Sequence, residues 1–265
     1  NQIVEQVNSG NFDAVHLHYD QYANIIPSLQ CKKKMITSHY PYLENPEPQY
    51  VFLYDLLKNS GAHIVCLSDR IQNEFLNRGN DSTNVSILPC GIDVNSYIID
   101  ESDVLYPDRS IVVGKIEPRK RQAFLQHKGL NIDFIGNNVD ASFDTNDSCY
   151  FGEQSKEDIM ENLTSYANMV LLSSGEAHPF VCLEGMAAGL GLVISEQSTA
   201  NLDVTKPFIT VIPDNKLNDT KFLKDEIDNN RKVSMNMRKE IRQYCRDNFD
   251  WCAIIKKYKE IIEKI

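Results

Sequence analysis

The sequence lacks long hydrophobic runs and an excess of basic charge. In 265 residues, no apolar segment approaches the roughly 20 residues that a membrane-spanning helix needs, so no transmembrane segment is expected. The 27 lysines and arginines are outnumbered by 37 aspartates and glutamates, which gives a net charge of -10. Such an acidic chain is not expected to bind nucleic acid.

The sequence also lacks paired cysteines and glycine-rich phosphate loops. Its seven cysteines form no Cys-x-x-Cys pair, and several, such as Cys66, lie in apolar runs typical of small core residues. We therefore expect neither a disulfide framework nor a metal site, and a reducing, cytoplasmic compartment fits best. There is no Walker pattern and no G-x-G-x-x-G, and Gly10 is the only glycine before Gly61.

What the chain does have is a regular alternation of short apolar runs and amphipathic segments, which predicts an α/β protein with parallel strands and helical crossovers. The first expected strands lie at residues 13–18, 35–39, 62–67 and 85–88. A helix is expected at 21–29 and a linker at 94–108. The second set of expected strands lies at 110–113, 132–135, 149–151, 169–172, 192–194 and 208–212. The chain from 219 onward is predicted to be helical.

The most informative stretch runs from Asn168 to Ser195, where an expected strand, a polar loop, a short helix and a second strand follow one another. Open α/β sheets bind ligands at the carboxyl ends of their strands, where such loops lie. Glu176 lies in the loop and Glu184 about one turn into the helix, so both carboxylates can flank one pocket and accept hydroxyls of a sugar or ribose. The alternative is that both acids are solvated and only satisfy the helix dipole.

The start of that helix predicts an anion site. If it begins near Pro179 or Phe180, Pro179 lies at a favoured first-turn position, where its missing N–H is not needed. The backbone amides of Phe180, Val181 and Cys182 would then lack helical partners and would suit a diphosphate.

Positive charge gathers just past the expected strand that ends at Gly114. The four bases that follow it within seven positions are Lys115, Arg119, Lys120 and Arg121. In a chain with a negative net charge, this local cluster of positive charge indicates an anionic ligand. The alternative is a helix start with solvated bases, although bases at a helix N-terminus oppose its dipole.

Three histidines lie at expected strand ends in the first half. His16 and His18 alternate with a leucine and therefore share a face, and His39 ends the neighbouring strand. Each could hold a proton near neutral pH or donate to a substrate oxygen. The alternative for each is a purely structural histidine.

Together these residues resemble glycosyltransferase family 4, nucleotide-sugar enzymes with the GT-B fold. The signatures occur in the family's order across roughly residues 11–262. They are Glu176 through Glu184 for E-x7-E, Gly114 through Lys120 for G-R-L-x-x-x-K, Leu88 through Asp93 for P-N-G-V-D, Phe151-Gly152 for F-x-G, and Phe249-Asp250-Trp251 for an aromatic pair.

The resemblance implies two Rossmann-like doubly wound domains facing across a cleft. We expect an acceptor-side domain over residues 1–105, shortened because it lacks the family's opening strand and glycine-rich loop. The donor domain is expected over 106–247, with the C-terminal helix, 248–265, packing back on the first domain. The implied reaction is a retaining transfer from a nucleotide-diphosphate sugar, without cofactor or metal, to an unknown acceptor that is a glycan, a lipid or a small molecule.

The resemblance also implies roles on the donor side. Glu184 would bind the ribose hydroxyls, and Glu176 would face the donor sugar. After the turn at Gly114, Lys115 and Lys120 would neutralise the diphosphate as it leaves. The amides of residues 180–182 would contact the sugar or phosphates.

On the acceptor side, His39 resembles a family histidine, and Asp13, His16 and His18 match a frequent D-x-x-H-x-H strand. The residues expected to be catalytic are therefore Glu176, His39 and Lys120.

The chain departs from the family pattern at several positions. Lys115 stands where arginine is usual, which keeps the charge but loses the bidentate fork. Cys90 replaces asparagine, Gly185 replaces alanine, and Gly191 stands where proline is usual. Two other functions stay open: a non-catalytic sugar-nucleotide-binding module or subunit of a heteromeric transferase, and a nucleotide-sugar epimerase that needs no acceptor.

Overall fold

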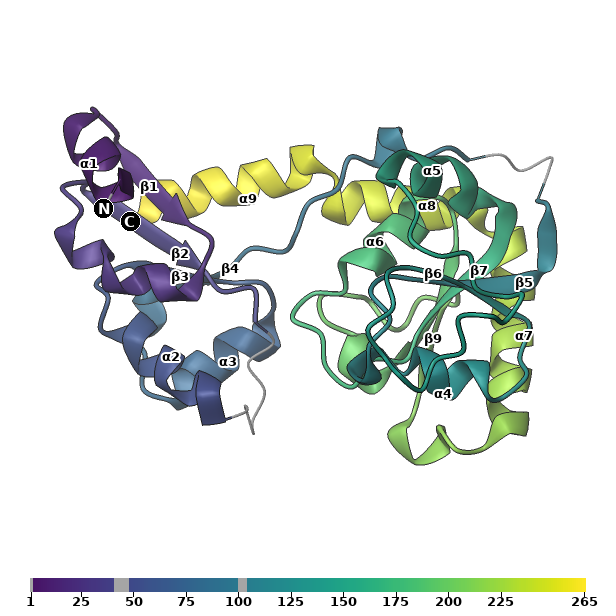
Figure 1. The fold of residues 1–265 in the computed structure, drawn as a ribbon. Helices are drawn as coiled ribbons and strands as arrows, with labels where there is room; N and C mark the ends of the chain where they lie inside the picture. The colour runs from purple at the N-terminus through teal and green to yellow at the C-terminus, as the bar shows by residue number, and fades with distance from the viewer. Residues whose placement is uncertain (1, 41–47, 100–103) are drawn as a thin grey trace. The chain divides into compact units, whose positions relative to one another are not determined.

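A computed structural model describes residues 2–40, 48–99 and 104–265. Its packing divides the chain into unit 1, Asn1–Cys90 with Cys252–Ile265, and unit 2, Gly91–Trp251. Each unit is built on one parallel sheet (Figure 1). The predicted α/β class with two parallel sheets is therefore confirmed.

Unit 1 contains a four-stranded sheet in the order β1-β2-β3-β4. The strands are β1 (Ala14–Leu17), β2 (Lys33–Thr37), β3 (His63–Cys66) and β4 (Val85–Ile87). Its helices include α1 (Gln2–Ser9), α2 (Pro48–Lys58) and α3 (Asp69–Asn77). The single helix predicted at 21–29 is wrong. Two 3-10 helices, η1 (Asp20–Asn24) and η2 (Ile26–Ser28), form there, since Pro27 has no N–H to continue an α-helix.

The last helix, α9 (Trp251–Lys264), completes the core of unit 1 with its residues from Cys252 onward. Buried Ile261 packs with buried Met35 and Val65 of the central strands. The Tyr258 hydroxyl lies 3.0 Å from His16 Nδ1. The end of the chain is thus part of the first sheet's core.

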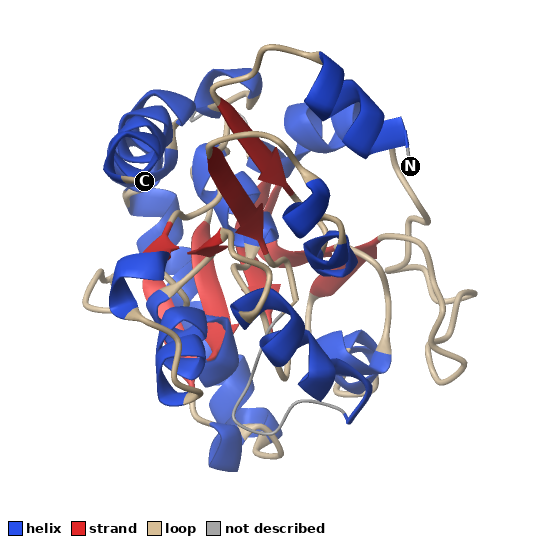
Figure 2. Ribbon diagram, turned by 90° about the vertical axis from the view of Figure 1, so that its left-hand side faces the viewer, coloured by secondary structure: helices blue, strands red, loops and turns tan. Residues whose placement is uncertain are grey.

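Unit 2 contains a five-stranded parallel sheet, and Figure 2 shows the strands of the chain in red among its blue helices. The strands are β5 (Tyr106–Val113), β6 (Ile132–Ile135), β7 (Tyr166–Leu171), β8 (Gly191–Ser195) and β9 (Ile209–Ile212). The helices are α4 (Gln122–Gln126), α5 (Lys156–Asn162), α6 (Phe180–Ala187), α7 (Thr220–Asn236) and α8 (Arg238–Phe249). Every residue of β7 and β8 is buried, as expected of apolar strands covered on both faces.

The strand order of unit 2, β6-β5-β7-β8-β9, creates a switch in direction at β5. The crossover to β6 goes to one side of β5, and β7 then pairs with its other side. The loops after β5 and β7 consequently diverge at the carboxyl edge, which is where open α/β sheets bind ligands.

Two further expectations from the sequence were wrong. Residues 149–151 form no named strand and only a single bridge, from Tyr150 to Phe134. Much of the expected linker packs into unit 2, where Val94 and Tyr97 are buried and β5 begins at Tyr106. Residues 100–103 of that linker lie outside the described residues. The packing also assigns Gly91–Ile99 to unit 2, whereas the prediction ended the first domain after residue 105.

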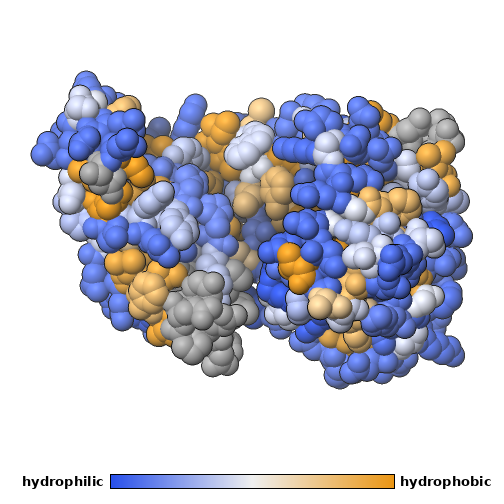
Figure 3. Space-filling model, viewed as in Figure 1, coloured by the Kyte–Doolittle hydropathy of each residue, from blue (hydrophilic) through white to orange (hydrophobic). Residues whose placement is uncertain are grey.

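Within the described part of the chain, no helix is long and apolar enough to cross a membrane. On the face drawn in Figure 3, most of unit 2 is hydrophilic and hydrophobic residues occur as separate spots. Scattered exposed apolar residues of this kind are ordinary on protein surfaces.

Candidate functional site

Two glycines shape the carboxyl edge of the unit 2 sheet. Gly114, just after β5, has φ +126, and a Cβ there would lie 2.7 Å from Nζ of Lys120. Gly136, just after β6, has φ +149, and its Cβ would meet the Gly114 carbonyl oxygen at 2.1 Å. Only glycine allows both the backbone conformation and this close approach. The Lys120 ammonium therefore lies directly against the end of β5.

The loop after Gly114 is not the continuous helix start that the alternative interpretation required. A 3-10 turn, η5 (Pro118–Lys120), is followed by Arg121 in the left-handed region with φ 58, and α4 begins only after it. The Arg121 guanidinium donates to the Leu172 carbonyl at 3.2 Å and lies 3.6 Å from the Asp214 carboxylate. These contacts hold a backbone conformation that is unfavourable for a residue other than glycine.

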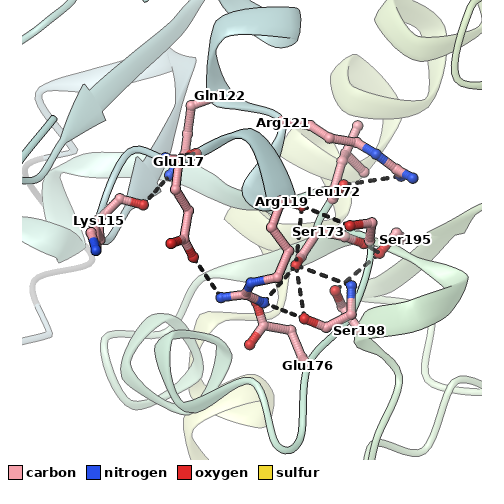
Figure 4. A network of polar contacts seen from close by, with 12 residues as sticks. Lys115, Glu117, Arg119, Arg121, Gln122, Leu172, Ser173, Glu176, Ser195 and Ser198 are labelled. Atoms are coloured by element: carbon pink, nitrogen blue, oxygen red, sulfur yellow. Dashed lines mark hydrogen bonds and ion pairs between the residues drawn. The ribbon is translucent and has the colours of Figure 1, made fainter. Parts of the chain in front are cut away.

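Arg119 is the centre of a polar network between the loops after β5 and β7 (Figure 4). Its guanidinium donates to Glu176 Oε1 at 2.9 Å, to Ser173 Oγ at 3.1 Å and to the Gly175 carbonyl. It also donates to Glu117 Oε1 at 2.7 Å. The two loops are thereby joined through one side chain.

Glu176 is held with one oxygen engaged. Its side chain is 14% exposed, and Oε1 accepts the bond from Arg119. Among the residues that the structure describes, Oε2 has no hydrogen-bond partner. The loop is anchored on its other side as well, because Ser195 Oγ donates to the Ser173 carbonyl at 2.6 Å.

Glu184, on α6, is a largely buried carboxylate with positive charge nearby. Burial raises its pKa, while the hydrogen bond from Tyr97 and the charges of Lys156 and Lys120 act in the opposite direction. The Tyr97 hydroxyl donates to Glu184 Oε1 at 2.9 Å. The structure therefore places Glu184 and Lys120 in the same electrostatic environment.

α6 begins at Phe180, one of the two starts expected from the sequence. Pro179 is the residue before the helix and not its first helical residue, and the Cys182 amide donates to the Pro179 carbonyl at 2.9 Å. The expectation that the Cys182 amide is unpaired was therefore wrong. In the described part of the chain, no partner is found for the Phe180 and Val181 amides, so two of the three predicted donors remain.

Lys115 does not join the network around Glu176. Its side chain is exposed and, in Figure 4, points away from Arg119, while its carbonyl accepts from Gln122 Nε2 at 2.8 Å. The cation that contacts Glu176 is Arg119, to which the sequence reasoning gave no separate role. The only feature of the sequence that pointed to Arg119 was its place in the cluster of four bases after Gly114.

The three histidines lie together at the edge of the unit 1 sheet. His18 Nδ1 lies 3.2 Å from His39 Nε2, and the His16 and His18 ring centroids are 4.2 Å apart. His16 Nε2 also lies 2.7 Å from Thr37 Oγ1. Burial, assisted by its two histidine neighbours, lowers the pKa of His16 to about 4. Burial likewise lowers the pKa of His18 and of His39.

The predicted catalytic residues are divided between the units. Glu176 and Lys120 belong to unit 2, and His39 belongs to unit 1. Over residues 2–40, 48–99 and 104–265, no group of three or more histidine, cysteine, aspartate or glutamate side chains is placed to hold a metal ion.

No family model and no curated protein sequence matches this chain. Solved structures do match. HepE (Alr3699) of Anabaena, in complex with UDP and glucose, is 14% identical with a TM-score of 0.74, over 100% of this chain and 81% of that one. Sucrose-phosphate synthase of Thermosynechococcus elongatus is 15% identical with a TM-score of 0.73, over 96% and 73%. The lipopolysaccharide outer core galactosyltransferase WaaB is 12% identical with a TM-score of 0.71, over 99% and 78%. At these identities the likeness shows a shared fold.

Proposed function

We propose that this chain is a glycosyltransferase that moves a sugar from a nucleotide-diphosphate sugar to an acceptor, with retention of the anomeric configuration and without a metal. The observation that carries the proposal is that the Lys120 ammonium lies against Gly114, at the switch point of a Rossmann-like sheet, where its charge also acts on the largely buried Glu184 carboxylate. A nucleoside diphosphate needs a cation for its phosphates and an acceptor for its ribose hydroxyls, and these residues supply both.

The shared fold supports the proposal. HepE has also been solved with UDP-glucose, and that structure matches 100% of this chain with a TM-score of 0.72. The GT-B arrangement, in which two units face each other across a cleft, and membership of family 4 both belong to this proposal.

In the proposed reaction, the bond between the anomeric carbon and the diphosphate oxygen breaks while the acceptor hydroxyl attacks. Negative charge grows on the leaving diphosphate, and Lys120 neutralises it, assisted by Lys115. Glu184 holds the ribose, and Glu176 accepts a hydroxyl of the donor sugar. The Phe180 and Val181 amides donate to the phosphates or the sugar.

Unit 1 supplies the acceptor side in this proposal. The histidines there are mainly neutral at pH 7, because burial lowers the pKa of each. A neutral imidazole can accept the proton of an acceptor hydroxyl. His39 is the residue proposed for that role, with His16 and His18 beside it.

Calorimetry with UDP, GDP and ADP tests the donor site. Wild-type protein is expected to bind at least one of them, and Lys120→Ala and Glu184→Ala are each expected to weaken binding tenfold or more, since one charge-assisted hydrogen bond is worth about 1.5–3 kcal/mol. Lys232→Ala and Glu226→Ala, on α7 of the same unit, are the matched controls and should bind as the wild type does. Undiminished binding in both site variants would refute the assignment.

A product assay separates the remaining functions. Incubation with the nucleotide sugar that binds and a panel of acceptors should yield a glycosylated product. Binding without turnover would favour a sugar-nucleotide-binding module or a subunit of a heteromeric transferase. A changed sugar formed without any acceptor would favour an epimerase.

A further inference from the structure

Arg119 makes several hydrogen bonds within the proposed donor site. It reaches three residues of the loop after β7 and one residue of its own loop. Its carbonyl oxygen also accepts a hydrogen bond from the Ser174 amide at 2.8 Å, so the backbone and the side chain of Arg119 both bind the loop after β7. That loop carries Glu176.

We propose that Arg119 is a positioning residue of the donor site, which fixes the Glu176 carboxylate without itself contacting the donor. One carboxylate oxygen, Oε1, is occupied by the guanidinium, and Oε2 is left to accept a hydroxyl of the bound sugar. The inference rests on the proposed function, because it assigns Arg119 a task in the same site.

Charge balance supports this task. Glu176 is largely removed from water, and a carboxylate in that position needs a charged partner. Arg119 provides it and also pairs with Glu117. Burial acts to lower the pKa of Arg119, but the ion pairs with Glu176 and Glu117 outweigh it and raise that pKa. The guanidinium therefore keeps its charge, and that charge is paired with the two carboxylates of Glu176 and Glu117.

The geometry explains why an arginine is needed at this position. A planar guanidinium can donate from Nη1 toward Ser173, Gly175 and Glu176 while Nη2 donates to Glu117. A lysine ammonium is a compact point charge and cannot span these acceptors at once. The next residue, Lys120, has its ammonium against Gly114. These two adjacent bases thus have different proposed roles: Arg119 binds a carboxylate, and Lys120 binds the phosphates.

The first test compares UDP with UDP-glucose in calorimetry. UDP carries no sugar, so Arg119→Ala should leave its affinity within threefold of the wild type. The additional affinity that the glucose provides in the wild type should be lost in Arg119→Ala and remain low in Arg119→Lys. Arg70→Ala, on α3 of unit 1, is the control and should change neither ligand.

The second test measures transfer kinetics. Arg119→Ala should lower kcat by about 10- to 100-fold, because displacement of a catalytic group by about 1 Å costs roughly that much. Added guanidinium should restore part of the rate, whereas methylammonium should not. In the Glu176→Gln background, Arg119→Ala should slow transfer by less than about twofold, since Arg119 acts through Glu176.

The outcomes separate the two claims. If Arg119→Ala weakens UDP as strongly as Lys120→Ala does, Arg119 contacts the diphosphate and the inference is wrong. If it keeps the wild-type kcat and the full contribution of glucose, the inference is wrong as well. If the wild type binds none of these ligands, the proposed function fails. Amide hydrogen exchange at Ser174 and Gly175 then decides the positioning role alone: faster exchange in Arg119→Ala supports it, and unchanged exchange refutes it.

Discussion

At the scale of single residues, the loop after β5 depends on a contact that a side chain at Gly114 would destroy. Nζ of Lys120 lies only 2.7 Å from the position that a Cβ would take. The backbone there has φ +126, a conformation that is strained for any residue with a side chain. Two separate effects of a substitution can therefore be expected, one on stability and one on binding.

Gly114→Ala tests both effects. The strained backbone should lower the free energy of unfolding by about 1–2 kcal/mol, and the displaced Lys120 ammonium should weaken UDP binding at least tenfold. Gly129→Ala is the matched control, because Gly129 has φ +62 but nothing lies within 4 Å of its Cβ position. It should lose similar stability, measured by urea unfolding, and bind UDP normally. Normal binding by Gly114→Ala would contradict the account of Lys120.

Residue-level features of the site were only partly predictable. Spacing alone placed Glu176 and Glu184 on either side of a helix start, because a strand, loop and helix leave little freedom over so few residues. The partners of these acids could not be predicted in the same way. Tyr97 lies far from Glu184 in sequence, and its hydroxyl reaches the carboxylate only because residues 91–99 pack into unit 2. Arg119 was one of four similar bases, and only its rotamer shows that it contacts Glu176.

At the scale of secondary-structure elements, β1 and α9 are joined through His16. Its ring lies between Thr37 of β2 and Tyr258 of α9, with His18 and His39 beside it. A neutral imidazole donates with one nitrogen and accepts with the other, so it can serve both neighbours. The protonated ring has two donors and no acceptor, and both contacts would then have to be made by donation.

The stability of unit 1 should therefore fall in acid. The folded-state pKa of His16 is about 4, below the unfolded value of 6.5, so its contribution is present above pH 6.5 and is lost as the pH falls toward 4. After allowance for solvent screening this amounts to about 2 kcal/mol. Urea unfolding followed by circular dichroism at pH 7.5, 6 and 5 should show a steeper loss in the wild type than in His16→Asn. His127→Gln, an exposed histidine of unit 2, is the control. Equal slopes for wild type and His16→Asn would contradict this prediction.

Strands and helices with a clear pattern of apolar residues were predictable from the sequence. Segments whose structure depends on contacts with distant parts of the chain were not. β7 and β8 were expected from their apolar runs alone. Residues 21–29 carry a helical pattern, yet two 3-10 turns form there, and Pro27 lies in the first turn of the second. Residues 149–151 looked like a strand, but the Phe151 amide donates to the Phe134 carbonyl as part of a single bridge. Hydrogen bonding at an edge of the sheet is not encoded in local sequence.

At the scale of the whole molecule, all residues proposed to bind the nucleotide lie in unit 2. The boundary between the units could not be located from sequence, because residues 91–99 have no strong period of their own. Ile92 instead donates its amide to the Phe249 carbonyl at 2.9 Å, and Trp251 donates to the Ile92 carbonyl at 3.2 Å. These bonds join residues at the start and the end of unit 2 to one another, so that both boundaries with unit 1 are defined by packing within unit 2.

Ligand binding should consequently stabilise the two units unequally. UDP at 100 times its Kd should add about 2.7 kcal/mol to the free energy of unfolding of the unit that binds it. Hydrogen exchange with mass spectrometry should show this protection in peptides from β5 to β9. Peptides from β1 to β4 should change little, and Glu184→Ala should abolish the effect at the same UDP concentration. Equal protection in both sets of strands would show that the nucleotide site is not confined to unit 2.

The place of Ile261 in the core of unit 1 also determines an order of events during protein synthesis. The ribosome makes β1 to β4 before unit 2, but Ile261, which covers Met35 and Val65, emerges only after the whole of unit 2. At the usual 5–20 residues per second, that delay is on the order of ten seconds or more. Unit 2 is continuous in sequence and can fold during this interval. Of the two units, the one whose synthesis starts earlier is therefore the one whose core is completed later.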